Sequence, residues 1–217
     1  MEKKTAFKDL SRKAKVQYIW DYYRWHIIVA VCVIGFIISL IVHYVTYKES
    51  VLDILMVSAI TPYSDNTTST DEFFEQEGFS DKEQEISIDT SVLVSDNAEH
   101  TVDYANDENI SLKLAFGGTD IFFAPEFIFE RYANQGCLMP LTEYLSEEEI
   151  AQYDDILVYA TDSETHETVP CGVQLTNNKW LSSNGYYSGN VYFGVVYATD
   201  AKDTAVDFFH YVMDYNP

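Results

Sequence analysis

The sequence predicts an α/β protein, with a single transmembrane helix followed by one domain built on a mixed, mainly parallel sheet. The transmembrane helix is indicated by "IIVAVCVIGFIISLIVHYVTY" (27–47), which contains no Asp, Glu, Lys or Arg. The sheet is indicated by strand-like runs that alternate with helix-like runs in the rest of the chain. We therefore divide the chain into a basic juxtamembrane helix (1–26), a transmembrane helix (27–47) and an α/β domain (48–217).

The charge of the chain is divided unevenly between these parts. Residues 1–26 carry seven basic and three acidic side chains, a net charge of +4. Since the whole chain has a net charge of −22, the residues after 26 carry −26. Basic residues beside a span stay in the cytoplasm. We therefore expect a single-pass protein of the cell membrane, with its N-terminus cytoplasmic and its domain outside. So acidic a domain repels phosphate backbones, which excludes nucleic acid as a partner.

The apolar run has the length of a membrane anchor, because about 20 apolar residues cross the hydrocarbon core as a helix. It is too long for the apolar part of a secretory signal, and no small-x-small cleavage pattern follows it. Aromatic residues of the kind found at membrane surfaces lie near both ends, at Trp20, Tyr22, Tyr23, Trp25, Tyr44 and Tyr47. We expect an uncleaved anchor that contacts the lipid bilayer through residues 27–47, preceded by a helix over residues 5–24.

The first half of the outer domain contains two predicted strands. Branched residues in "SVLDILMVSAI" (50–60) predict a buried strand, and the alternation in "EISIDTSVLV" (85–94) predicts a half-buried one. Between them we expect a short helix that begins near Asp71 and stops at Gly78. Residues 95–109 are predicted to form a polar loop, and "ISLKLAFGG" (110–118) is predicted to be helical.

The second half begins with a buried strand (119–124) and a helix. Pro125 suits the first helical position and Gly136 a helix stop. Ser146 and Glu149 have the spacing of a capping box at the next helix. A polar hairpin tip then leads into a strand at Val169, and residues 190–197 form another strand. Asp200 is expected to cap a final helix whose inward face carries Ala205, Phe208, Phe209, Val212 and Met213.

Sequence motifs of enzymatic chemistry are absent: G-x-S-x-G, the P-loop, H-E-x-x-H and C-x-x-C do not occur. The acidic run "DDILVYATDSETHE" (154–167) offers oxygen ligands. It lacks the spacing and the glycine of an EF-hand loop, so we interpret it as a solvated hairpin tip. We therefore expect no metal site, no cofactor and no enzymatic activity.

Two of the three cysteines, Cys137 and Cys171, lie in the predicted outer domain, and Cys32 lies in the span. Disulfides form in oxidising compartments outside the cytoplasm. A bridge between Cys137 and Cys171 would add ~3–4 kcal/mol through loop closure. The sequence fits this disulfide and a pair of partly buried free thiols equally well.

The stretch "GGTDIFFAPEFIFERYANQGCLMPLTEYLSEEE" (117–149) resembles a segment of bacterial extracellular solute-binding proteins, especially the sugar-binding type. The matching residues are Gly118, Asp120, Ile121, Gly136, Leu138, Pro140, Leu141, Tyr144 and Leu145. Further on, "ETVPCGVQL" (167–175) is similar to the hairpin and strand of that family. The closing "GVVYATDAKDTAVDFFHYVMD" (194–214) is similar to its late strand and helix.

The resemblance implies one lobe of a two-lobed periplasmic-binding-protein fold, since residues 48–217 suffice for one lobe only. In such a lobe, ligand contacts would come from the loops after the strand ends. In this sequence they are Thr61, Pro62, Tyr63, Pro125, Glu126, Asn177 and Trp180. Trp180 also fits a packing role at the edge of the core.

These features favour a non-catalytic binding or interaction module at the membrane, accessory to a transporter or a sensor. Its partner would be a small solute, or a membrane or extracellular protein. Closure over a solute needs two walls, so a structural protein that binds a partner protein and no small molecule is the alternative. An extracellular hydrolase is a more distant one, since the members of a catalytic triad can lie anywhere along a chain.

Overall fold

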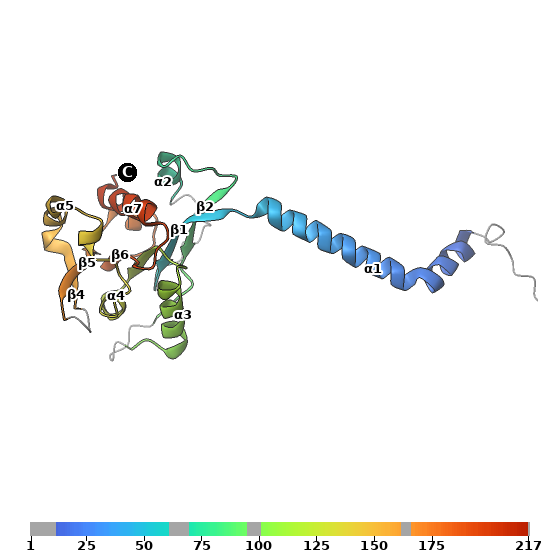
Figure 1. The fold of residues 1–217 in the computed structure, drawn as a ribbon, viewed down its shortest axis with the longest axis horizontal. Coiled ribbons are helices and arrows are strands. Elements are labelled where there is room, and N and C mark those ends of the chain that lie inside the picture. Colours follow the sequence, from blue (N-terminus) through green and yellow to red (C-terminus); the bar gives the residue numbers. More distant parts are fainter. Residues whose placement is uncertain (1–11, 61–69, 95–100, 162–165, 217) are drawn as a thin grey trace, which may run out of the picture. The chain divides into compact units, whose positions relative to one another are not determined.

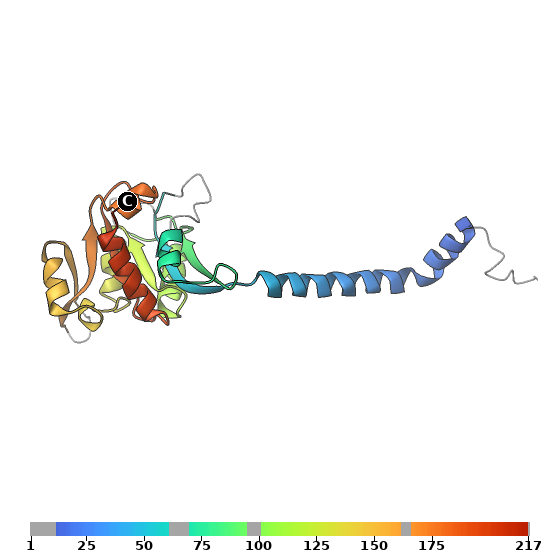
Figure 2. The same cartoon turned by 90° about the horizontal axis from the view of Figure 1, so that it is seen from above.

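The computed structural model describes residues 12–60, 70–94, 101–161 and 166–216. The chain divides into two units, Met1–Tyr47 and Lys48–Pro217 (Figures 1 and 2). In the first unit, α1 (Arg12–Thr46) is one helix of 35 residues. Its stretch Trp20–Thr46 is long and apolar enough to cross a membrane, and none of its residues is buried. The helix predicted over residues 5–24 is confirmed from Arg12 on, since residues 5–11 lie outside the described part of the chain, and the helix predicted over 27–47 is confirmed as far as Thr46.

In the second unit, six strands of the described residues form one sheet in the order β2-β1-β3-β6-β5-β4. β1 pairs in parallel with β2 and β3, whereas β3–β6, β6–β5 and β5–β4 are antiparallel pairs. The predicted mixed α/β sheet is confirmed, and its parallel pairing is confined to β2–β1–β3. The strands are β1 (Glu49–Met56), β2 (Gln84–Asp89), β3 (Ile121–Ala124), β4 (Leu157–Thr161), β5 (Thr168–Leu175) and β6 (Val191–Val195).

Helices cover both faces of this sheet. They are α2 (Asp71–Gln76), α3 (Tyr104–Ala115), α4 (Glu126–Ala133), α5 (Glu147–Gln152), α6 (Lys179–Ser183) and α7 (Lys202–Asp214), with short 3-10 turns η3 (Leu141–Glu143) and η4 (Asp154–Ile156). Phe73 of α2 and Phe208 and Phe209 of α7 pack on one face. Ile110 of α3 and Ile128 of α4 pack on the other. The domain therefore has three layers, α/β/α.

The strands supply this two-sided core because successive side chains point to opposite faces. Along β3, Ile121 and Phe123 join the cluster under α2 and α7, while Phe122 and Ala124 join the cluster under α3 and α4. All four side chains are fully buried. A strand buried on both faces has a continuous apolar run, which explains why "IFFA" shows no alternation.

Two glycines make room for a ring on the face covered by α4. A Cβ atom at Gly172 of β5 would lie against Cζ of Phe129 and 2.6 Å from the carbonyl oxygen of Phe193. A Cβ atom at Gly194 of β6 would lie 3.1 Å from the same Cζ. The ring of Phe129 thus occupies the space left by absent side chains on two neighbouring strands.

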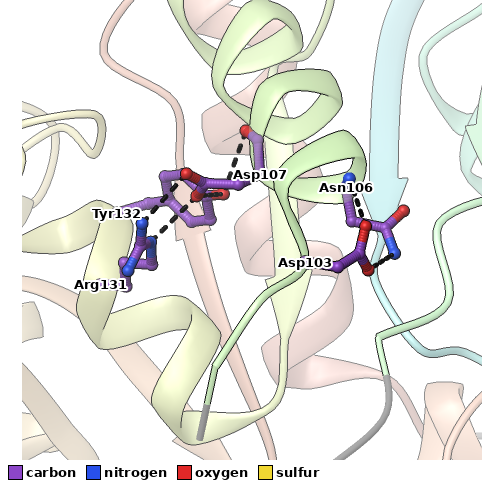
Figure 3. A network of polar contacts seen from close by, with 5 residues as sticks. All are labelled: Asp103, Asn106, Asp107, Arg131 and Tyr132. Atoms are coloured by element: carbon purple, nitrogen blue, oxygen red, sulfur yellow. Dashed lines mark hydrogen bonds and ion pairs between the residues drawn. The ribbon is translucent and has the colours of Figure 1, made fainter.

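A polar cluster joins α3 to α4 (Figure 3). The guanidinium of Arg131 donates two hydrogen bonds of 3.0 Å to the carboxylate of Asp107. The hydroxyl of Tyr132 donates to the same carboxylate at 2.8 Å. At the start of α3, the side chain of Asp103 accepts from the backbone N–H of Asn106 and caps the helix.

Several local predictions need correction. The second strand ends at Asp89 and not at residue 94, and α3 begins at Tyr104, inside the predicted loop. β4 and α6 were not expected. The final helix has Ala201 as its N-cap, whose N–H donates to the hydroxyl of Thr199, so Asp200 is not the cap. The Ser146–Glu149 capping box is present at α5, as predicted.

Candidate functional site

The carboxyl ends of β1, β3 and β5 lie at one edge of the sheet, because these three strands run in the same direction. The predicted ligand contacts follow these ends. Thr61, Pro62 and Tyr63 lie outside the described residues. Pro125 is the N-cap of α4 and Glu126 its first residue. Asn177 is exposed after β5, with a positive φ of 53°.

The edge between β1 and β3 is closed by the segment after α6. The hydroxyl of Tyr187 donates to the carbonyl oxygen of Val57 at 2.8 Å and lies 3.5 Å from that of Phe123. Burial of this hydroxyl raises the pKa of Tyr187. The N–H of Ile60 donates to the carbonyl oxygen of Tyr186 at 2.7 Å. The chain itself thus occupies the position where a ligand would meet the strand ends.

Glu126, the predicted ligand contact that follows β3, also lies close to another side chain of the protein. Burial, together with a hydrogen bond to Glu126 and the charge of Glu126, raises the pKa of Tyr192 to about 12. The carboxylate of Glu126 therefore lies near the Tyr192 hydroxyl, at the edge where a ligand contact was predicted.

Trp180 has a packing role in this structure. Its side chain is 0% exposed. Its ring lies 5.3 Å from that of Phe208, edge to face, and 6.1 Å from that of Phe123, stacked. The expectation that Trp180 contacts a ligand is corrected accordingly, because a fully buried ring offers no face to a sugar.

Asp120, the acidic residue of the resemblance, holds the opposite end of β3. Its carboxylate accepts from the N–H of Asp53 at 2.7 Å and from the hydroxyl of Thr199 at 2.5 Å. Burial raises the pKa of Asp120. These bonds tie β1 and the loop before α7 to the start of β3, so the residue is structural.

Cys137 and Cys171 are free thiols in this structure. Cys171 belongs to the cluster beneath α3 and α4, and the half-buried Cys137 packs against that cluster. The thiol of Cys171 donates to the carbonyl oxygen of Val158 at 3.6 Å. Burial raises the pKa of both thiols, that of Cys171 to about 12. Such thiols are poor nucleophiles, because the thiolate is the reactive form.

A groove of about 430 Å³ lies between α2 and α7, two helices that Figure 2 shows side by side. Its volume falls within the range of small-molecule sites, about 300–1,000 Å³. Aromatic rings form a row along it: the ring of Tyr211 lies 5.3 Å from that of Phe73 and 5.5 Å from that of Tyr215. Phe73 is buried beneath the row, so the rings that the groove offers to a ligand are those of the half-buried Tyr211 and Tyr215.

Carboxylates from both helices surround these rings, namely Glu72, Glu77, Asp207 and Asp214. The hydroxyl of Tyr211 donates to Glu72 at 3.3 Å. Partial burial and the nearby charge of Asp207 raise the pKa of Glu77. His210 also lines the groove, and its Nε2 lies 3.8 Å from Glu149. The groove is therefore suited to a ligand or a protein segment that carries positive charge.

This groove could not be predicted from the sequence, because it depends on tertiary contacts. The apolar face of α7 was predicted from its periodicity. Its outer residues, such as Asp207 and Tyr211, gain a partner surface only because α2 packs beside α7. The one local signal was the unusual pair of tyrosines near the C-terminus, Tyr211 and Tyr215. Within the described part of the chain, no three His, Cys, Asp or Glu residues converge to hold a metal ion.

No protein-family model, no curated protein and no solved structure matches this chain. The resemblance to solute-binding proteins carried by residues 117–149 therefore stays a prediction. The observations that bear on function are the apolar helix, the closed sheet edge and the groove between α2 and α7.

Proposed function

We propose that this chain is a single-pass membrane protein whose acidic α/β domain lies outside the cytoplasm and binds a partner without catalysing a reaction. The observation that carries the proposal is the stretch Trp20–Thr46, 27 residues of apolar helix, none of them buried by the protein. Leaving so much apolar surface in water is unfavourable, at roughly 25 cal/mol for each Å². A lipid bilayer removes this cost.

The orientation follows from charge. The seven basic residues within 1–26, beside the apolar run, support an N-terminus in the cytoplasm. In that orientation the domain is an extracytoplasmic module, accessory to a transporter or sensor. Its resemblance to one lobe of a solute-binding protein agrees with the α/β architecture.

The groove between α2 and α7 is the proposed binding surface. It combines an apolar row of rings with carboxylates on both sides, a lining that recognises a cation next to an apolar group. The sheet edge is less suitable, since the hydroxyl of Tyr187 donates to the carbonyl oxygen of Val57 there. This closure favours a protein partner over a solute bound at the strand ends.

Thermal melting of the full-length protein in detergent, against sugars, amino acids, short basic and acidic peptides, and calcium, tests the binding proposal. A ligand at 100 times its Kd stabilises by about 2.7 kcal/mol, which raises the Tm by several degrees. We expect a shift with basic peptides that is lost in the Glu72→Gln/Asp207→Asn variant. Glu147→Gln/Asp155→Asn, two exposed carboxylates elsewhere, is the matched control.

A shift that survives in the groove variant would place the binding site elsewhere on the domain. A flat panel from a protein that melts cooperatively would favour the alternative, a structural protein that binds a partner through a wider surface.

A further inference from the structure

The basic side chains of the domain leave one group of carboxylates without a partner. All of its lysines and arginines lie in described residues, and none of them lines the groove between α2 and α7: Lys48, Lys82, Lys113, Arg131, Lys179 and Lys202. Arg131, for example, pairs with Asp107. Within the described residues, no such ion pair is formed by the acidic side chains of the groove: Glu72, Glu77, Asp207 and Asp214. A positive charge from another molecule is the partner that these carboxylates lack.

Two carboxylates of the groove are close enough to repel each other. Glu77 is the C-cap of α2, and Asp207 lies in the second turn of α7. Partial burial, and then the charge of Asp207, raise the pKa of Glu77. A like charge disfavours the ionised form of a carboxyl group, whereas an opposite charge within about 4–6 Å favours it. A cation bound between Glu77 and Asp207 is therefore stabilised by both side chains.

An aromatic ring lies beside this pair of carboxylates. Tyr211 follows Asp207 by four residues on α7, so the two side chains are neighbours on one face of the helix. The half-buried ring of Tyr211 lies 5.3 Å from that of Phe73, and its hydroxyl donates to Glu72 at 3.3 Å. The protein thus holds the ring in place while part of its surface stays open to the groove. A cation within about 6 Å of such a ring is attracted to its face.

A guanidinium suits this lining better than an ammonium. It is planar, it presents a fork of N–H donors to carboxylates, and it stacks on aromatic rings. The contact between α3 and α4 shows part of this chemistry within the domain, since Arg131 donates two hydrogen bonds of 3.0 Å to Asp107, which also accepts from the hydroxyl of Tyr132 (Figure 3). An ammonium is a compact, strongly hydrated charge, so it gains less from a ring and a pair of carboxylates.

We propose that the groove between α2 and α7 binds an arginine side chain of a partner protein segment, with Glu77 and Asp207 accepting from its guanidinium and the ring of Tyr211 against its plane; this rests on the binding role proposed for the groove. The occupant is a segment and not free arginine, because acidic side chains extend beyond this pair. Asp214 follows Asp207 by two turns, about 10 Å along α7, which one guanidinium does not span. The partner segment is therefore expected to carry at least two basic residues.

Fluorescence anisotropy of labelled peptides with the full-length protein in nonionic detergent tests the preference for arginine. The first peptide carries two arginines among glycine, serine and leucine, and its two twins carry lysines or citrullines at the same positions. We expect the arginine peptide to bind at least about fivefold more tightly than the lysine twin, because a cation–π contact and forked hydrogen bonds favour it. Citrulline has the shape of arginine without its charge, so the citrulline twin is expected not to bind.

Variants of the groove locate the bound arginine. Glu77→Gln/Asp207→Asn is expected to weaken binding of the arginine peptide about tenfold, since two charged hydrogen-bond acceptors are lost. Glu147→Gln/Asp155→Asn, which removes two exposed charges elsewhere, is expected to leave binding unchanged. Tyr211→Leu is expected to remove the preference for arginine over lysine, whereas Tyr211→Phe, which keeps the ring, retains it. The melting temperature of each variant verifies its fold.

Equal affinity for the arginine and lysine peptides, with both lost in Glu77→Gln/Asp207→Asn, would overturn the arginine assignment alone and leave the binding role of the groove standing. Equal weakening in Glu147→Gln/Asp155→Asn would show that the peptides follow the overall charge of the domain, which contradicts binding in the groove. Competition by a single blocked arginine as strong as that of the peptide would exclude a segment as the occupant. Binding of none of the peptides would overturn both proposals.

Discussion

The hydroxyl of Tyr187 determines what the carboxyl edge of the sheet can bind. It donates to Val57 at the end of β1, at the point where the resemblance to solute-binding proteins places a ligand. The residue lies 130 positions from its acceptor in sequence, so no local pattern reveals the contact. The ligand contacts predicted beside the strand ends stay a prediction, and the approach of the chain's own Tyr187 to this edge depends on tertiary structure.

Tyr187→Phe is expected to destabilise the domain by about 1–2 kcal/mol, because the buried carbonyl oxygen of Val57 loses its hydrogen bond. Urea unfolding of the full-length protein in detergent measures this change. Tyr197→Phe, where the ring is 57% exposed, is the control and should change little. Equal effects of the two substitutions would show that the Tyr187 hydroxyl does not close this edge.

Gly172→Ala is expected to cost about 1–3 kcal/mol, since the added methyl group would overlap with the ring of Phe129 and the carbonyl of Phe193. Gly189→Ala is the matched control, because a Cβ atom there meets nothing within 4 Å. Both variants can be compared by their melting temperatures. Full stability of Gly172→Ala would contradict the close packing of α4 on β5 and β6.

Between elements, the contact of α3 with α4 depends on one carboxylate. Burial acts to raise the pKa of Asp107, but the hydrogen bonds from Arg131 and Tyr132 outweigh it and hold that pKa below its ordinary value. Its stabilising contribution is therefore present above the unfolded pKa of about 3.9 and is lost as the pH falls through the folded pKa. The exposed Arg131 side chain limits the size of this contribution.

Asp107→Asn is expected to cost about 0.5–1 kcal/mol at pH 7. Because protonation removes the same interaction from the native protein, the difference between the two proteins should begin to shrink as the pH falls below the unfolded pKa of about 3.9 and should vanish below the folded pKa. Urea unfolding at a series of pH values measures it, with the exposed Glu108→Gln as control. A difference that stays constant down to pH 3 would exclude an ionised Asp107 as its source.

Helices and strands could be predicted where the apolar pattern of the sequence matches the residues that the fold buries. β3 and β6 have continuous apolar runs, β1 is rich in branched apolar residues, and α7 has a clear inward face, so all four were expected. β4 was missed because Tyr159 and Thr161 are exposed on an edge strand among acidic residues, and its sequence resembles a solvated hairpin. The start of α3 was predicted too late in the chain because Asp103, Asn106 and Asp107 are residues that favour loops. In the structure Asp103 caps the helix, and Asp107 accepts a hydrogen bond from Tyr132 of α4.

At the scale of the whole molecule, the division into an apolar helix and an α/β domain was predictable, since it depends on composition over long stretches. The groove between α2 and α7 was not, because it requires two helices separated by about 130 residues to pack side by side. The central features proposed for this protein are therefore the membrane anchor and the side of the membrane that holds the domain.

Protease treatment of intact cells that express the full-length chain tests this claim most directly. We predict that protease removes the domain and leaves a protected fragment that contains residues 1–47 and resists extraction by alkaline carbonate. Two results would contradict the account. One is a domain that is digested only after the cells are broken, and the other is a mature protein from which residues 1–47 have been cleaved.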